Sequence, residues 1–164
     1  TGKTWLARQL APLLGVAPGA LHLRSDEIRK RRAGLAPEQR LPPEAYAPGE
    51  SAAVHAEMFA AARTALAAGH SVVLDAMFLD AGLRQAASEA AASAPFTGIW
   101  LEAPLELLRV RVAARQGDAS DATVEVLDRA ARTDPGAIDW YRVDARDPLS
   151  PARRLLALNG DSAA

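Results

Sequence analysis

Hydrophobic residues along this chain repeat at two periods, and segments of the two kinds alternate. Leu6, Leu10 and Leu13 share one face at a spacing typical of a helix, which Gly15 ends. The continuous apolar run at 71–75 is typical of a buried strand. The pattern predicts strands at 20–25, 71–75, 96–102 and 138–144. It predicts helices from Thr4 to Gly15, from Asp26 onward, and at about 51–68, 81–93, 104–117, 120–132 and 150–159, with Ser120 capping the helix at 120–132.

Strands that alternate with amphipathic helices predict an α/β domain, in which helices cover both faces of a parallel sheet. The 164 residues are enough for one domain and too few for two. The segment 35–50 holds four prolines and is long for a loop inside a compact domain, so we expect it to be functional or mobile.

Composition narrows the class of protein further. The formal net charge of −1 offers no general attraction to nucleic acid or to an anionic membrane. The absence of cysteine excludes disulfides, thiolate metal sites and cysteine nucleophiles. No apolar run approaches the ~20 residues of a membrane span. We therefore expect a soluble, cytoplasmic protein.

The triplet Gly2-Lys3-Thr4 stands where a helix begins, and it matches the second half of the phosphate-binding pattern G-x-x-x-x-G-K-[ST]. Thr1, Gly2, Lys3 and Thr4 are therefore the predicted nucleotide-binding residues, with Lys3 on the β- and γ-phosphates of ATP and the Thr4 hydroxyl on Mg²⁺. An ordinary helix start remains the alternative, because the triplet is common. The first glycine and the strand before the loop are not in this sequence. We expect 1–164 to be one domain, truncated at its N-terminus.

Two acids follow predicted strands, at the edge of a parallel sheet where ligands bind. Asp75 ends the apolar run at 71–75, where an acid can hold Mg²⁺ through water; it could otherwise form a turn. Asp26 follows the strand at 20–25, and a first-turn acid that stabilises its helix is the alternative interpretation.

Three elements together resemble a known family: Ser25-Asp26-x-x-Arg29-Lys30, Leu74-Asp75-Ala76 and Arg115-x-x-Asp118-x-Ser120-Asp121-Ala122. They resemble the AAA_33 group of small P-loop kinases, which is similar to gluconate kinases, zeta toxins and polynucleotide 5′-kinases. The resemblance implies a P-loop NTPase three-layer sandwich with a mostly parallel sheet and a helical lid, its first strand missing here. In bacteria such domains also occur C-terminal to an aminoglycoside-phosphotransferase-like domain. The resemblance therefore implies that the parent chain can carry a fused upstream domain.

The resemblance also implies roles for single residues. Asp26 would accept or orient the hydroxyl of the phosphate acceptor. Arg29 and Arg84 would contact this acceptor, although both could lie on solvated helix faces. Arg115, with Arg111 second, would supply the lid arginines that stabilise the transferring phosphoryl group.

The leading hypothesis is thus a kinase that uses ATP and Mg²⁺ to phosphorylate a small molecule such as a sugar, sugar acid, aminoglycoside or nucleotide sugar. A polynucleotide 5′-kinase would need a basic channel beyond 29–32, which the sequence does not show. The third alternative is an ATP-binding regulatory module of a fused protein. A module of that kind needs no acid on the acceptor side, so Asp26 favours the kinase.

Overall fold

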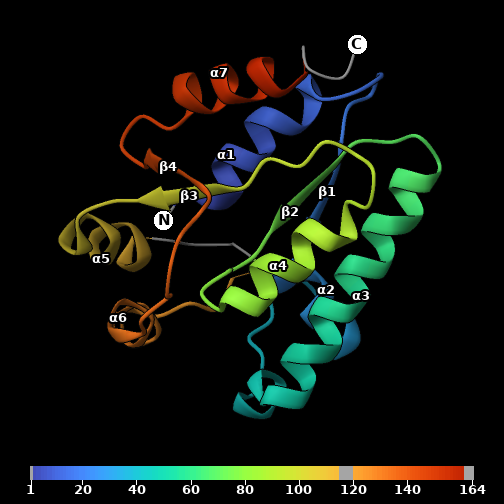
Figure 1. Ribbon diagram of the computed structural model, residues 1–164. Helices are drawn as coiled ribbons and strands as arrows, with labels where there is room; N and C mark the ends of the chain where they lie inside the picture. Colours follow the sequence, from blue (N-terminus) through green and yellow to red (C-terminus); the bar gives the residue numbers. More distant parts are fainter. Residues whose placement is uncertain (1, 115–119, 161–164) are drawn as a thin grey trace.

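The computed structural model describes residues 2–114 and 120–160, and its strands and helices alternate as the hydrophobic pattern predicts (Figure 1). The strands are β1 (Leu21–Arg24), β2 (Val72–Asp75), β3 (Ile99–Glu102) and β4 (Tyr141–Asp144). The helices are α1 (Lys3–Leu10), α2 (Ser25–Arg32), α3 (Pro48–Ala67), α4 (Ala81–Ala90), α5 (Leu105–Ala113), α6 (Val124–Arg132) and α7 (Leu149–Gly160), with 3₁₀ turns η1 (Ala11–Leu13) and η2 (Pro43–Tyr46).

The strands form two parallel pairs (Figure 1). In the first pair Leu21 of β1 lies opposite Val72 of β2, and Arg24 lies opposite Asp75. In the second pair β3 runs alongside β4 in the same direction. Within residues 2–114 and 120–160 no strand pairs β2 with β3.

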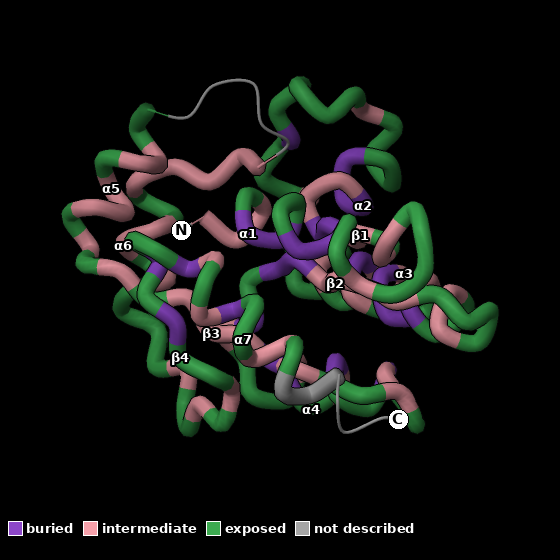
Figure 2. The backbone as a smooth tube through the Cα atoms, turned by 90° about the horizontal axis from the view of Figure 1, so that it is seen from above, coloured by how far each residue is buried: buried purple, intermediate pink, exposed green. Residues whose placement is uncertain are grey.

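Two hydrophobic clusters hold the layers together. The larger one joins α2, α3 and α4 to the end of β2, and Val54 and Met58 of α3 are completely buried in it. The smaller one joins α1 and α7 to β3. Burying a large aliphatic or aromatic side chain contributes about 1.5–3 kcal/mol. Helices therefore cover the strands from both sides, and Figure 2 shows buried segments where α1, β1, β2 and α3 meet.

Several element boundaries differ from the prediction, among them the starts of α6 and α3. Helix α6 begins at Val124, not at 120, because the Thr123 side chain accepts a hydrogen bond from the Val126 N–H and caps it. The prediction that Ser120 caps this helix is therefore wrong. The segment 35–50 contains η2, and α3 begins inside it at Pro48, where a first helical turn accepts proline. None of the described helices is long and apolar enough to cross a membrane.

Candidate functional site

The Gly-Lys-Thr triplet stands at the start of α1. Gly2 precedes the helix with a φ of 100°, a left-handed conformation that glycine adopts without strain. Among the described residues, no side chain caps α1 and no acid lies in its first turn. The first N–H groups of α1 and the positive end of its dipole therefore suit an anion such as phosphate. The predicted contacts Thr1 and Arg115 lie outside the described residues.

Thr4 and Asp75, the predicted metal ligands, lie side by side. The Thr4 hydroxyl donates a hydrogen bond to Asp75 Oδ2 at 2.6 Å, across 71 positions of sequence. Burial alone would raise the pKa of Asp75, but the neighbouring His22, Lys3 and Thr4 side chains together lower it below its ordinary value. A hydroxyl and an ionised carboxylate are hard oxygen donors. They fit Mg²⁺, which takes few protein ligands and completes its shell with water and substrate phosphates.

Two residues of β1 that the sequence did not single out, His22 and Arg24, also contact this pair. His22 Nε2 lies 3.5 Å from Asp75 Oδ2, an electrostatic contact. Arg24 is 4% exposed and its guanidinium lies 3.7 Å from the Asp75 carboxylate and 3.5 Å from Thr4 Oγ1. It also donates to Glu27 at 2.6 Å. The sequence did offer a signal for these contacts. His22 and Arg24 alternate along β1 and so lie on one face of the strand, and Arg24 at its end lies opposite Asp75.

Asp26 lies in the first turn of α2, directly after β1. Burial raises its pKa above the ordinary value of 3.8, and the charge of Asp75 adds to this rise. The Ser120 side chain and the cations Lys3 and Arg24 act in the opposite direction without cancelling it. Asp26 is therefore a carboxyl group of increased basicity within electrostatic reach of the phosphate and metal residues, which suits proton transfer.

Arg29, one turn after Asp26, is buried between α2, η2 and α3. Its guanidinium donates to the Ala45 carbonyl at 2.6 Å and to Ser51 Oγ at 3.2 Å, and it lies 4.9 Å from the centre of the Tyr46 ring. Burial and the charge of Arg29 lower the pKa of His55 on α3. These contacts show that Arg29 holds the end of the proline-rich loop, and its contact with an acceptor stays a prediction.

Arg84 of α4 is 3% exposed and binds four backbone carbonyls. It donates to Phe78 and Leu79 after β2, at 2.8 and 2.9 Å. It also donates to Pro135 and Ala137, in the segment before β4, at 2.7 and 2.9 Å. Its described contacts join two loops of the fold, and its role as a substrate contact stays a prediction.

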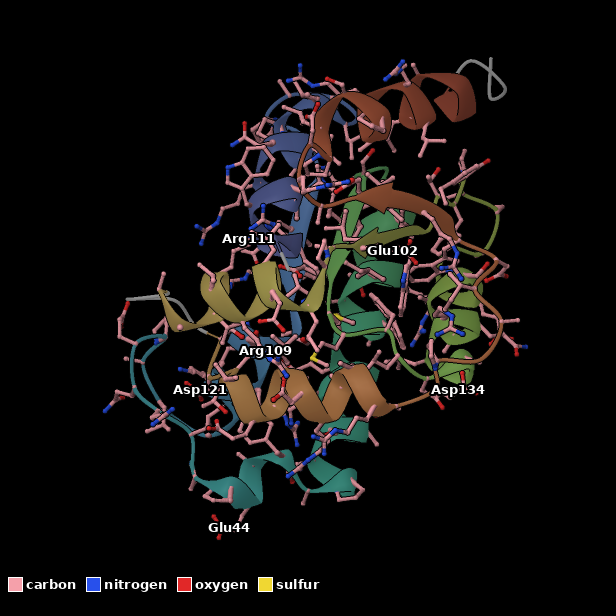
Figure 3. All side chains as sticks on the ribbon, turned by 90° about the vertical axis from the view of Figure 1, so that its left-hand side faces the viewer. Glu44, Glu102, Arg109, Arg111, Asp121 and Asp134 are labelled. Carbon is pink, nitrogen blue, oxygen red and sulfur yellow. The ribbon has the colours of Figure 1, made fainter. Side chains whose placement is uncertain are left out.

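The arginines of α5 point to different neighbours (Figure 3). The Arg111 guanidinium lies on the side facing α1, where a Cβ added to Gly2 would be 3.7 Å from its Nη1, and it donates to the Ala145 carbonyl at 2.9 Å. The structure thus brings Arg111 beside Gly2, and its role as a lid arginine stays a prediction. Arg109 lies between α5 and α6 instead and pairs with Asp128 at 3.0 Å.

A hollow of about 550 Å³ lies between the proline-rich loop, the end of α5 and the segment that precedes α6. One wall is the proline-rich loop with Glu38 and Arg40, and the other is the segment from Ser120 to Glu125. Ser120 belongs to this wall, and hydrogen bonding by its side chain lowers the pKa of Asp26, so Ser120 links the hollow to the candidate proton acceptor. Its size and polar lining suit a small polar molecule.

The fold and this site define a P-loop nucleotide-binding domain: a helix starts at a Gly-Lys-Thr triplet, and its threonine meets an acid at the end of a parallel strand. The comparison with protein families agrees. Residues 1–133 match the AAA_33 family, described as an AAA domain, and the chain belongs to this family.

The curated relatives that match this chain are named as uncharacterized proteins. The chain is 32% identical over 157 residues to uncharacterized protein Rv2004c of Mycobacterium tuberculosis and to uncharacterized protein Mb2027c of Mycobacterium bovis. The match covers 90% of this chain but only 30% of the length of each relative. Among solved structures, a gluconokinase from Sinorhizobium meliloti 1021 shares the fold, with a TM-score of 0.57 and 22% identity over 99% of this chain and 89% of that one.

Proposed function

We propose that this domain transfers the γ-phosphate of ATP to a hydroxyl group of a small polar molecule. The observation that carries the proposal is Asp26, a carboxyl group at the carboxyl end of β1 whose pKa is raised by burial and which feels the charges of Lys3 and Asp75. A domain that only binds ATP needs no such acid. The gluconokinase of the same fold supports the proposal, because its name describes a kinase of a small polyhydroxyl acid.

Each part of the site has a task in this reaction. The start of α1 and Lys3 would hold the β- and γ-phosphates. Thr4 and Asp75 would hold Mg²⁺, which neutralises phosphate charge when bound. Asp26 would take the proton from the acceptor hydroxyl as its oxygen attacks phosphorus and ADP leaves. Arg111, beside Gly2, would add positive charge on the nucleotide side.

The acceptor would occupy the hollow between the proline-rich loop and the segment that precedes α6. The candidate acceptors remain those that the sequence suggested, namely a sugar, sugar acid, aminoglycoside or nucleotide sugar.

A polynucleotide acceptor is disfavoured, because two arginines of the basic run 29–32 are paired with acids. Arg31 pairs with Glu57 at 2.6 Å, and Arg32 pairs with Glu50 and Glu57 at 3.4 Å. Ion pairing of this kind reduces the attraction to a phosphate backbone.

The test is ATP consumption by the full-length protein against a panel of sugars, sugar acids, aminoglycosides and 5′-hydroxyl oligonucleotides. Asp26→Asn is the variant, because it keeps the shape and removes the basicity. Glu57→Gln is the control, since Glu57 is an acid that pairs with the surface arginines Arg31 and Arg32. We expect acceptor-dependent turnover that falls about 10²–10⁴-fold in Asp26→Asn and is retained in Glu57→Gln.

The same panel separates the alternatives. Turnover stimulated only by oligonucleotides would make the domain a polynucleotide kinase. Binding of Mg·ATP without turnover on any acceptor, unaffected by Asp26→Asn, would refute the kinase and leave a nucleotide-binding module.

A further inference from the structure

The most deeply buried cation of the described residues is Lys30 of α2, which is 1% exposed. Its ammonium group donates to the carbonyls of Pro37 at 2.7 Å and Gln39 at 2.5 Å, and to Asp121 Oδ1 at 3.0 Å. A lysine ammonium has three N–H bonds, so all of them have partners here. A charge buried this deeply is tolerated only when it is paired and hydrogen-bonded.

Asp121 completes the arrangement from the other side. Its second oxygen, Oδ2, accepts hydrogen bonds from the Leu41 N–H and from the Tyr46 hydroxyl, both at 3.0 Å. Burial would raise the pKa of Asp121, but the Leu41 N–H, Lys30 and Tyr46 together lower it below the ordinary value. The carboxylate is therefore ionised at neutral pH and matches the charge of Lys30. We call Lys30 and Asp121 the loop clamp.

The loop clamp joins three parts of the chain that are far apart in sequence. Lys30 comes from α2, its carbonyl partners from the proline-rich loop, and Asp121 from the segment before α6, 91 positions away from Lys30. Figure 3 shows Asp121 in this region, beside α5 and α6 and above the η2 turn that carries Glu44. The neighbour of Lys30, Arg29, holds the Ala45 carbonyl at the far end of the same loop.

These contacts shape the hollow rather than the phosphate site. Asp121 itself lines the hollow, and Glu38 and Arg40, which form its other wall, lie between the loop positions that the loop clamp holds. None of the hydrogen bonds described for Lys30 and Asp121 reaches Lys3, Thr4 or Asp75.

We propose that Lys30 and Asp121 are positioning residues, which fix the proline-rich loop as a wall of the acceptor site and so determine affinity for the acceptor but not for the nucleotide. This proposal rests on the proposed kinase function, because the hollow is an acceptor site only in a kinase. The loop clamp acts through the loop, so its removal should leave nucleotide binding intact.

The geometry offers a direct physical test in the full-length protein. The Gln39 carbonyl accepts from Lys30 and the Leu41 N–H donates to Asp121, so the loop clamp holds the chain on both sides of the Arg40–Leu41 peptide bond. Trypsin cuts after arginine and needs a locally opened chain. Mass spectrometry measures the rate of tryptic cleavage after Arg40. We expect this rate to increase about tenfold or more in Asp121→Asn.

The matched control is Glu57→Gln, which breaks the surface ion pairs of Glu57 with Arg31 and Arg32 between α3 and α2 and leaves the loop clamp intact. Its cleavage after Arg40 should stay within about twofold of the wild type. Tyr46→Phe removes a single donor to Asp121 and keeps the Lys30 pair, so it should accelerate cleavage by less than Asp121→Asn. It also keeps the test valid if Asp121→Asn does not fold.

Kinetics and nucleotide binding then separate positioning from general damage. For the acceptor that the panel identifies, Asp121→Asn and Tyr46→Phe should raise the acceptor KM, while the KM for ATP and the Kd for Mg·AMPPNP stay within about twofold. Unchanged cleavage after Arg40 in both variants, or equal losses of ATP and acceptor affinity, would overturn the proposal. Absence of turnover in the wild type would instead overturn the kinase function, and the cleavage rates would still report whether the loop clamp holds the loop.

Discussion

Replacing Arg84 with methionine tests whether this arginine stabilises the fold or binds substrate. Methionine has a similar length and no charge, so Arg84→Met removes the hydrogen bonds to the four carbonyls and leaves most of the packing. The bond to the Phe78 carbonyl is buried, and an unsatisfied buried carbonyl costs about 1–3 kcal/mol. The bonds to Leu79, Pro135 and Ala137 are partly buried, where water can replace the guanidinium at about 0.5 kcal/mol each.

The total loss in the free energy of unfolding is therefore about 3 kcal/mol. For a domain of this size that lowers Tm by about 6–12 °C. Hydrogen exchange of peptides from α4 measures the loss locally, and we expect exchange to be about a hundredfold faster. Arg31→Met is the control, because Arg31 is exposed and its pair with Glu57 contributes at most about 1 kcal/mol.

Kinetics on the same variant complete the test. Below its unfolding temperature, Arg84→Met should keep the acceptor KM of the wild type, since the carbonyls already use both terminal nitrogens of its guanidinium. A variant with unchanged stability and a raised acceptor KM would refute this reasoning and make Arg84 the substrate contact that the sequence suggested.

Three further changes have expected outcomes. Asp26→Asn should raise Tm at neutral pH. Because the pKa of Asp26 is higher in the folded state than in the unfolded state, ionisation of Asp26 destabilises the fold; this loss begins above the unfolded-state pKa and is complete above the folded-state pKa. The increase in Tm over the wild type should therefore shrink as the pH falls. Thr4→Val, measured by calorimetry, should weaken binding of ATP about tenfold or more with Mg²⁺ present, and less than that with EDTA. Met58→Ala should cost about 2–5 kcal/mol in urea unfolding, because Met58 is completely buried.

The sequence predicted the order of elements and the meeting of Thr4 with Asp75, because both follow from local patterns. Hydrophobic period identifies strands and helices, and parallel strands place their carboxyl ends at one edge of a sheet. The start of α6 was missed for a physical reason. Ser120 and Thr123 are both good caps, and only the tertiary contacts of the segment around Asp121 decide between them.

The partners of buried cations could not be predicted in the same way. Lys30 and Arg29 stand in a run of four basic residues, which is usually a solvated helix face, yet both are buried. The carboxylate that pairs with Lys30 is 91 positions away, and a local sequence pattern cannot predict a contact between residues so far apart. The expectation that a strand precedes Thr1 in a longer chain is likewise untested and stays a prediction.

The buried polar side chains of the β1–α2 segment and of α4 differ in how fully they are hydrogen-bonded, and full hydrogen bonding is typical of side chains that hold the fold. Lys30 uses every N–H on backbone and Asp121 oxygens, and Arg84 divides its donors among four carbonyls. By contrast, His22 Nε2 and Arg29 Nε are buried without a hydrogen-bond partner among the described residues. Native proteins leave few buried donors unsatisfied, and such atoms concentrate at functional sites. His22 Nε2 faces the Asp75 carboxylate at 3.5 Å, so its charge belongs to the electrostatics of the candidate metal site, whereas Lys30 and Arg84 hold loops of the fold.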